Sequence, residues 1–434
     1  MTSRTAALIA LLVLGAALVG AIALTTPWQP LGADPPAESA DPGRDFSSPE
    51  IAREVAFHDA VRPPGLTGFV VVLVVAGVLG LTPLGARLVG AAGRVGGGRW
   101  ALTVVAGSAA LTLALTLVRL PFSARAELAR RRFGLSTQDW SGWTVDVAKS
   151  AAVSATMMAV LLLGVVLLAR RSPDWWWAWA AGAAAMVVVV VSFAYPVVVE
   201  PIFNRFTPMA AGELRDSLLE LAERDGVSVD DVLVADASRR TTALNAYVSG
   251  LGATRRIVVY DTLVRQASPE EVRLVVAHEL GHVVEDDVRD GTLMGALGAA
   301  AAMPLLFLLL GWGPLLRRAG VSGVADPRSL ALVAFLITAV TTVTGPVQSL
   351  VSRRVEARAD VHSLDLTRDP MSFVASERRL AVTNLSDLEP NRALYLLFAS
   401  HPSAPERIAL ARAWALRVGL PVPPDLVPGS GGAG

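Results

Sequence analysis

Residues His278-Glu279-Leu280-Gly281-His282 form an HExxH motif in a segment whose pattern predicts a helix. Two histidines four residues apart lie on one helix face, about one turn from each other, so both imidazoles can bind a single zinc ion. The glutamate between them is then placed to take a proton from an attacking water molecule. The chain has only five histidines, so a chance match to this spacing is a weak alternative.

The residues before the motif carry the signals of a helix N-terminus. Ser268 is a cap residue, Pro269 takes the first helical position, and Glu271 has capping-box spacing from Ser268. An apolar stripe follows, made by Val272, Val275, Val276, Leu280 and Val283. We therefore expect the metal-binding helix to run to about Asp286.

The hydrophobic content of the chain is concentrated in long runs of Ala, Val, Leu and Gly. The fraction of hydrophobic residues is 53%, which is above the average for a globular domain. Such runs are typical of membrane spans. We predict seven, at about residues 6–25, 66–84, 101–118, 151–169, 176–198, 291–311 and 329–350. The first resembles a secretory signal but lacks a clear cleavage site, which favours an uncleaved anchor.

Charge and cysteine content exclude several classes of function. The formal net charge of zero gives no reason to expect a nucleic-acid partner. The chain has no cysteine, so disulfides, thiol nucleophiles and cysteine-bound zinc are excluded, and any metal site must use His, Asp and Glu. His58 is expected to be an exposed loop residue, and His362 is not expected to bind metal. Basic charge that is almost entirely arginine favours a bacterial source with a GC-rich genome.

The spans divide the chain into membrane and water-soluble parts. We predict five spans with two long polar connections in residues 1–200, a first metallopeptidase half in 201–290, two further spans in 291–350, a second half in 351–425, and a disordered tail in 426–434. The polar connections are 26–65 and 119–150. Because two spans separate the soluble halves, both halves lie on the same side of the membrane and can join into one catalytic unit.

The two soluble halves differ in their patterns. The first reads as α+β, with an amphipathic helix over residues 212–224 and short β-branched runs at 232–234 and 257–260. Residues 244–248 lie between these runs and are expected to complete a small sheet. The second half is helical, with another capping-box pattern at Ser403 and Glu406.

A catalytic zinc site needs a third protein ligand and an open position for water. Glu356 is the best candidate, since its segment continues from the last predicted span, as one helix. Asp360 lies four residues further along the same helix face and could hydrogen-bond a ligating histidine. The alternative is a solvated charged helix in which these acids pair with Arg353, Arg354 and Arg358.

These motifs together resemble the type I CAAX prenyl protease family, whose members are integral-membrane zinc metalloproteases. HELGH is followed about seventy residues later by Glu356-Ala357-Arg358-Ala359-Asp360. The resemblance extends to Asn245-Ala246-Tyr247, the run 256–263, Leu120-Pro121-Phe122, Phe133-Gly134-Leu135-Ser136, the run 201–206, and His401-Pro402-Ser403 with Glu406-Arg407. It covers nearly the whole chain, and the span count agrees with it.

The resemblance implies roles for individual residues. His278, His282 and Glu356 would bind one zinc ion, and Glu279 would be the general base. Asp360 would support the catalytic site, and His401 would lie near the metal and contact substrate or the developing oxyanion. Asn245 would lie on the edge strand that holds substrate, and Arg407 would brace the catalytic groups at the substrate-binding site. The alternatives are a turn residue for Asn245, a loop histidine for His401 and a surface charge for Arg407.

The sequence therefore predicts a mainly α polytopic membrane protein with seven transmembrane helices and a split α+β zinc-metallopeptidase domain. The expected reaction is hydrolysis of peptide bonds in flexible, membrane-associated or CAAX-like C-terminal substrates. The expected partners are a peptide or protein substrate and the lipid bilayer of the cell membrane, with the active site on the cytoplasmic side. The alternatives are a quality-control membrane protease of the HtpX heat-shock type, a signalling receptor, and a non-catalytic scaffold or transporter.

Overall fold

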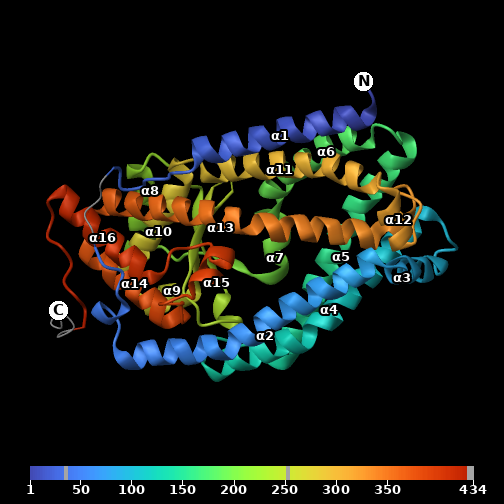
Figure 1. The fold of residues 1–434 in the computed structure, drawn as a ribbon. Coiled ribbons are helices and arrows are strands. Elements are labelled where there is room, and N and C mark those ends of the chain that lie inside the picture. Colours follow the sequence, from blue (N-terminus) through green and yellow to red (C-terminus); the bar gives the residue numbers. More distant parts are fainter. Residues whose placement is uncertain (34–37, 251–254, 428–434) are drawn as a thin grey trace.

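The computed structural model describes residues 1–33, 38–250 and 255–427 of the chain. Seven of its helices are long and apolar enough to cross a membrane, which confirms the predicted number of spans. They are α1 (Ser3–Thr25), α2 (Ser48–Leu81), α4 (Trp100–Arg132), α5 (Trp140–Arg171), α6 (Trp176–Ala194), α11 (Asp287–Leu310) and α13 (Leu330–Thr367). Helices α1, α6 and α11 lie together along one side, and α13 runs between them and the pair α2 and α4 (Figure 1).

Several of these helices are much longer than a bilayer requires. Helix α2 has 34 residues and α13 has 38. At 1.5 Å per residue they reach about 51 and 57 Å, against about 30 Å for a hydrocarbon core. Their outer turns therefore project beyond the membrane, and α13 is a single helix from its span to the predicted third ligand, as the sequence indicated.

Both predicted polar connections contain long helical parts that were not predicted from the sequence. A capping box between Ser47 and Glu50 starts α2 well before its apolar run. Helix α4 continues to Arg132, and α5 begins at Trp140. Polar composition shows that a segment leaves the hydrocarbon core, but it does not by itself end a helix.

A four-stranded sheet has the strand order β1-β2-β4-β3. The strands are β1 (Phe206–Pro208), β2 (Asp231–Ala235), β3 (Ala246–Ser249) and β4 (Arg256–Tyr260). The predicted strands correspond to β2, β3 and β4, whereas β1 was not predicted. Strands β2 and β4 are parallel, and β3 pairs antiparallel with β4 at one edge of the sheet. Leu244 was expected in a strand but lies before β3.

The sheet and three helices share one hydrophobic core. Helices α8 (Glu213–Arg224), α9 (Asp261–Gln266) and α10 (Pro269–Val284) contribute to it. Leu218, Ile257, Val276 and Leu280 are fully buried there. The core therefore fixes α10, which carries the HExxH motif, against the sheet.

The second soluble part adds α14 (Pro370–Asn384), α15 (Arg392–Phe398) and α16 (Ala404–Val418). Helix α14 contacts α10, and α16 contacts α13. Asp45, between α1 and α2, makes a buried bidentate ion pair with Arg412 of α16, at 2.5 and 2.8 Å. The segment after the first span is thereby joined to the C-terminal half of the protein.

The remaining short elements lie in the connections. They are α3 (Pro83–Arg94), α7 (Glu200–Phe203), α12 (Gly313–Ala319), a π-helical turn at Tyr195–Val199, and 3₁₀ turns at Pro42–Arg44, Ala237–Arg239 and Pro327–Ser329. Helices α3 and α12 lie at the end of the molecule opposite α10, α14 and α16 (Figure 1). Most of the tail predicted at 426–434 lies outside the described residues.

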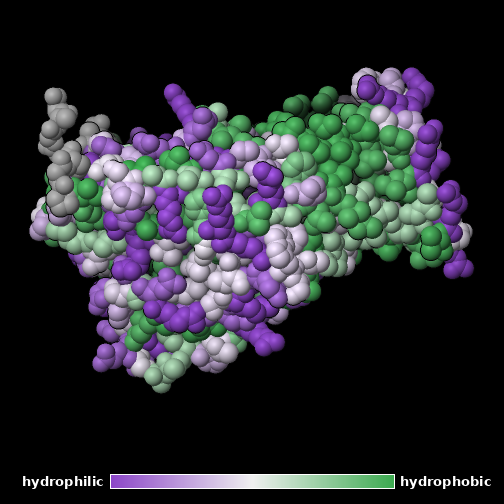
Figure 2. Space-filling view, turned by 90° about the horizontal axis from the view of Figure 1, so that it is seen from below, coloured by the Kyte–Doolittle hydropathy of each residue, from purple (hydrophilic) through white to green (hydrophobic). Residues whose placement is uncertain are grey.

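The hydrophobicity of the surface differs between the spanning helices and the water-soluble parts. Figure 2 shows an apolar region bounded by a hydrophilic rim at one end and by the larger, mainly hydrophilic part at the other. Exposed Leu113, Val160 and Val190 come from three different spanning helices. An apolar surface of this kind is stable when it faces lipid.

Candidate active site

Helix α10 holds the HExxH motif in a fixed orientation. The Ser268 hydroxyl accepts a hydrogen bond from the Glu271 N–H at 3.3 Å, and the Glu271 carboxylate accepts one from the Ser268 N–H at 2.7 Å. This reciprocal cap is the one predicted from the sequence. Because buried Leu280 anchors the other face, His278, Glu279 and His282 all border the same cavity.

Helix α13 brings Glu356 to the two motif histidines. Ligand atoms of His278, His282 and Glu356 all lie within 4.8 Å of one another. The Glu356 carboxylate is 3.2 Å from Nε2 of His278 and 3.7 Å from Nε2 of His282. Three side chains from two helices, 78 residues apart for His278 and Glu356, therefore converge on one point.

The chemistry of these three residues fits a zinc ion. Two imidazoles and one carboxylate are a ligand set of catalytic zinc sites, which leave one position open. Burial acts to lower the pKa of His278, but its hydrogen bonds to Asp360 and Glu356 outweigh burial and raise the pKa to about 10. The same negative potential favours a divalent cation among these donor atoms.

Each motif histidine is oriented by a second carboxylate. Nδ1 of His278 donates to Asp360 at 2.9 Å, and Nδ1 of His282 donates to Asp287 at 2.9 Å. Both Nε2 atoms are thereby turned toward Glu356. Fixing the tautomer and the ring plane of a metal-ligating histidine is the usual role of such a carboxylate.

Asp287 was not identified from the sequence. It lies at the start of α11, directly after Asp286, which has a left-handed backbone with φ of 57°. That turn redirects the chain so that Asp287 faces back toward His282, and Arg358 of α13 bonds it from the other side. The acidic run 285–287 just after the motif was the available signal, but helical spacing alone does not bring its third member to His282.

Arg407 lies behind the site rather than on the surface. Its Nε donates to Asp360 at 2.9 Å, and its Nη1 donates to Glu377 of α14 at 2.7 Å. Burial raises the pKa of Glu377 to about 7, although Arg407 opposes this shift. Both ends of the guanidinium are thus engaged by carboxylates, which favours the bracing role of Arg407 over direct substrate contact. Glu377 was not identified from the sequence.

Glu279 borders the cavity beside the metal-binding group. Burial raises the pKa of its carboxyl, while the neighbouring His278 and His282 act in the opposite direction. A carboxylate with a raised pKa is a stronger base than one in water. The position and the basicity of Glu279 are therefore both suited to proton transfer.

The cavity that contains these residues has a volume of about 1160 Å³. Its walls come from α10, α14 and α15, from the start of β3, from the middle of α2 and from the C-terminal part of α4. Ligand cavities commonly measure about 300–1,000 Å³, so the space is ample for a short length of peptide.

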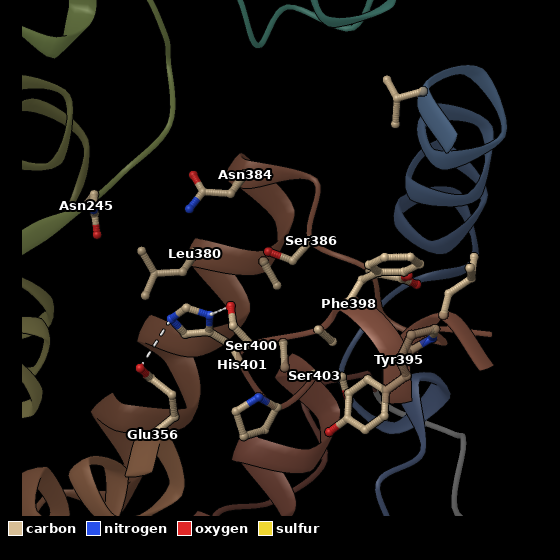
Figure 3. Close-up of a pocket in the computed structure, with 18 of the residues that line it drawn as sticks. Asn245, Glu356, Leu380, Asn384, Ser386, Tyr395, Phe398, Ser400, His401 and Ser403 are labelled. Carbon is tan, nitrogen blue, oxygen red and sulfur yellow. Dashed lines mark hydrogen bonds and ion pairs between the residues drawn. The ribbon is translucent and has the colours of Figure 1, made fainter. Parts of the chain in front are cut away.

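Two predicted residues, His401 and Asn245, also border the cavity. Nε2 of His401 is 3.4 Å from the Glu356 carboxylate, and its Nδ1 is 2.9 Å from the Ser400 hydroxyl (Figure 3). The His401 side chain is 62% exposed, so it can reach a ligand in the cavity. Asn245 was expected in the edge strand but lies directly before β3, where its carbonyl accepts a hydrogen bond from the N–H of Tyr260 in β4 at 3.0 Å.

The other two histidines lie away from the metal-binding group. His58 was expected in an exposed loop, but it lies within α2 and donates from Nε2 to the Leu385 carbonyl at 2.9 Å. Nε2 of His362 lies 2.9 Å from the carboxylate of Asp225.

Comparison with known proteins identifies two matching family models. Residues 208–415 match peptidase family M48. Residues 67–205 match the CAAX prenyl protease N-terminal region, described as five membrane helices. The first match holds both metallopeptidase halves together with the spanning helices α11 and α13, and the second holds most of the segment from α2 to α6.

Individual proteins show the same similarity. An uncharacterized metalloprotease, YhfN of Bacillus subtilis (strain 168), is 31% identical over 300 residues, which cover 69% of this chain and 70% of that protein. A CAAX prenyl protease 1 homolog of Oryza sativa subsp. japonica is 33% identical over 228 residues, or 50% of this chain and 51% of that protein. CAAX prenyl protease 1 of Saccharomyces cerevisiae is 48% identical over 88 residues, or 20% of this chain and 19% of that protein. The matched region thus spans about half or less of these two eukaryotic relatives.

The crystal structure of S. mikatae Ste24p has the same fold. The TM-score is 0.76, and the match covers 95% of this chain and 99% of that chain. The sequence identity is 22%, so this comparison bears on the fold alone.

The carboxylates behind the histidines should control zinc affinity. We expect Asp287→Asn and Asp360→Asn each to weaken zinc binding by about 10–100-fold, because either change removes the charge that orients one imidazole. Competition with a chromophoric chelator measures the affinity. Asp286→Asn is the matched control, since it makes the same chemical change beside Asp287 without contacting a histidine. Wild-type affinity in Asp287→Asn would exclude the orienting role.

Proposed function

The chain belongs to the CAAX prenyl protease family within peptidase family M48, and from this premise we propose that it is a zinc-dependent endopeptidase acting on flexible, membrane-associated peptide segments. It is a multi-span membrane metalloprotease, and thus a hydrolase. The proposal adds the metal, the role of each residue and the form of the substrate.

The convergence of three candidate metal ligands beside Glu279 is the observation that best supports the proposal. The ligand atoms of His278, His282 and Glu356 lie within 4.8 Å of one another, and Glu279 borders the same cavity from the same helix as the histidines. Three metal ligands beside a basic carboxylate are the minimum that metal-assisted hydrolysis requires. A charged helix exposed to solvent, the alternative for Glu356, does not explain this convergence.

Each residue of the site has a separate role in the proposed reaction. A zinc ion held by His278, His282 and Glu356 would supply Lewis acidity, polarising the scissile carbonyl and lowering the pKa of water. Glu279 takes the proton of the attacking water and passes it to the leaving nitrogen. His401, exposed in the cavity, donates a hydrogen bond to the carbonyl oxygen as negative charge develops on it.

The remaining residues hold these groups in place. Asp360 and Asp287 keep the two imidazoles oriented, and Arg407 with Glu377 fixes Asp360 from behind. Asn245 and the exposed edge of β3 bind an extended substrate through its backbone. Backbone pairing of this kind needs a segment whose own N–H and C=O groups are free, so a folded domain is a poor substrate.

The family matches support a CAAX-type protease over the alternatives. The match of residues 67–205 to a five-helix CAAX protease region favours this reading over an HtpX-type protease. The intact set of His278, Glu279, His282 and Glu356 opposes a decayed scaffold or transporter.

We also propose that the active site faces the cytoplasm of a cell-membrane protein. Residues 119–150 carry six basic residues, three of them consecutive, and Arg353 and Arg354 follow the last span on the same side. Short cytoplasmic connections are enriched in Lys and Arg. The connections on the opposite side also carry arginines, which reduces the difference between the two sides; they include Arg87, Arg94, Arg99, Arg170, Arg171, Arg317 and Arg318.

Removal of the general base should separate metal binding from activity. We expect Glu279→Gln to lower kcat by about 10²–10⁴-fold while keeping about one zinc per chain, because Glu279 is not a ligand. His278→Ala, His282→Ala and Glu356→Ala should lose both metal and activity. Plasma emission spectrometry gives the zinc content, and a fluorogenic peptide gives the rate. Full zinc and full activity in Glu356→Ala would refute its assignment as third ligand.

A reporter fused after α16 should be active only as a cytoplasmic type. The physical reason is the consecutive basic run at 130–132 and the arginines that follow the last span, which lie on the side of the active site. A pair of alkaline phosphatase and fluorescent-protein fusions measures this, with the same pair fused before α1 as the control. Phosphatase activity of the fusion after α16 would reverse the orientation.

The flexibility of the substrate should affect the cleavage rate more than a prenyl group attached to the substrate does. We expect one peptide sequence to be cleaved with or without a prenyl group, faster with it because the lipid holds the peptide at the membrane, and very slowly when placed inside a folded soluble domain. Mass spectrometry of the products measures all three forms. Equal cleavage of the folded form would contradict an enclosed site, and an absolute need for the lipid would restrict the enzyme to prenylated substrates.

A further inference from the structure

Asn384, the last residue of α14, pairs with the backbone of Leu244 just before the edge strand. Its Oδ1 accepts a hydrogen bond from the Leu244 N–H at 2.8 Å, and its Nδ2 donates to the Leu244 carbonyl at 3.1 Å. A carboxamide offers the same donor and acceptor as a peptide unit. Asn384 therefore occupies the position that a residue of a neighbouring strand would take opposite Leu244.

The direction of the backbone shows which side of the strand Asn384 covers. In an antiparallel pair, alternate residues direct their N–H and C=O toward the partner strand. The carbonyls of Ala243 and Asn245 are bonded on the β4 side, to Thr262 and to Tyr260 respectively. By this alternation the backbone N–H and C=O groups of Leu244, Ala246 and Val248 point to the open edge. Asn384 already occupies those of Leu244.

This closure lies inside the catalytic cavity. Asn384, Leu244 and Ala246 all border it together with Glu279. Figure 3 shows Asn384 at the end of its helix, next to the chain segment that carries Asn245, with Glu356 and His401 across the same space. A segment paired with the open edge therefore meets the Asn384 side chain beside the reacting groups.

The backbone after Asn384 is held in a conformation that a leucine seldom adopts. Leu385 has φ of 50°, and its side chain is buried. A left-handed backbone is strained at a bulky residue and persists only where its surroundings enforce it. The hydrogen bond from His58 of α2 to the Leu385 carbonyl is one such restraint. Asn384 is thereby a fixed group and not a mobile one.

We propose that Asn384 is a positioning residue that ends backbone pairing of the substrate at Ala246 and so selects which peptide bond is cleaved. This inference rests on the proposed function, in which β3 holds the substrate. A substrate can pair with Ala246 and Val248, but the position at Leu244 is taken, so the chain must turn away from the edge there. Because side chains of a strand repeat every two residues, a slipped substrate would move by two residues.

The first test is a map of cleavage positions. The probe is β-casein, an unfolded protein with many extended segments, digested by the purified full-length protein and analysed by mass spectrometry. We expect Asn384→Ala to open the position at Leu244 and to add products displaced by two residues from the wild-type sites. Asn384→Asp keeps an acceptor for the Leu244 N–H but loses the donor to its carbonyl, so it should add fewer displaced products than Asn384→Ala.

Asn391→Ala is the matched control. Asn391 also bonds backbone N–H groups, those of Ala393 and Leu394, but it does not contact the edge strand. It should keep the wild-type cleavage positions. Unchanged positions in both Asn384 variants, with only lower rates, would overturn the inference and leave a structural role for Asn384. In contrast, activity retained by Glu279→Gln would count against the proposed function itself.

The second test needs no catalysis. In a Glu279→Gln background, excess β-casein should slow hydrogen exchange at the amides of Ala246 and Val248 without changing exchange at Leu244. Adding Asn384→Ala should make exchange at Leu244 depend on β-casein as well. Casein-dependent protection of Leu244 while Asn384 is present, or no such protection after Asn384 is removed, would overturn the inference.

Discussion

The contact between α10 and α13 is the constraint on which the rest of the site depends. Asp360 is completely buried, and a buried carboxylate is tolerated only when other groups compensate its charge. His278 bonds it from α10, and Arg407 bonds it from α16. Arg407 is compensated in turn by Glu377 of α14. Four helices must therefore meet at one point, and that meeting aligns Nε2 of His278 with Glu356.

The same contact fixes the position of the candidate site relative to the spanning helices. Helix α13 is continuous from its apolar span to Glu356 and Asp360, so these groups lie at a fixed height above the hydrocarbon core. Helix α11 does the same for Asp287, which begins a spanning helix and holds His282. A candidate metal site joined to two spanning helices in this way cannot tilt independently of those helices. A peptide anchored in that bilayer would thus meet the site in a limited range of orientations.

The cavity explains how the protein can keep an open strand edge near its active site. Exposed edges invite pairing with other chains, and proteins usually block or cover them. Here the middle of α2 and the C-terminal part of α4, together with α14 and α15, form walls of the cavity that contains the start of β3. Asn384 closes one end of that edge with a side-chain amide. The edge is left available only to a segment thin enough to enter the cavity.

The sequence by itself determined the features that rest on local chemistry. The spacing of His278 and His282, the capping box at Ser268 and the seven apolar runs each follow from residues close together in the chain. Polar composition was less informative, because a polar segment can be either helical or irregular. It did not predict that α2 and α4 extend as helices through the polar residues 48–65 and 119–132.

Only the tertiary structure decided which distant groups meet. Asp287 reaches His282 through the left-handed turn at Asp286, and Glu377 reaches Arg407 because α14 packs beside α16. Asn384 lies 140 residues from Leu244, and no local pattern relates the two. The physical reason is common to all three cases. A periodic pattern reports which face of one helix is buried, whereas the partner of a buried charge or of a free backbone group is set by how separate helices pack.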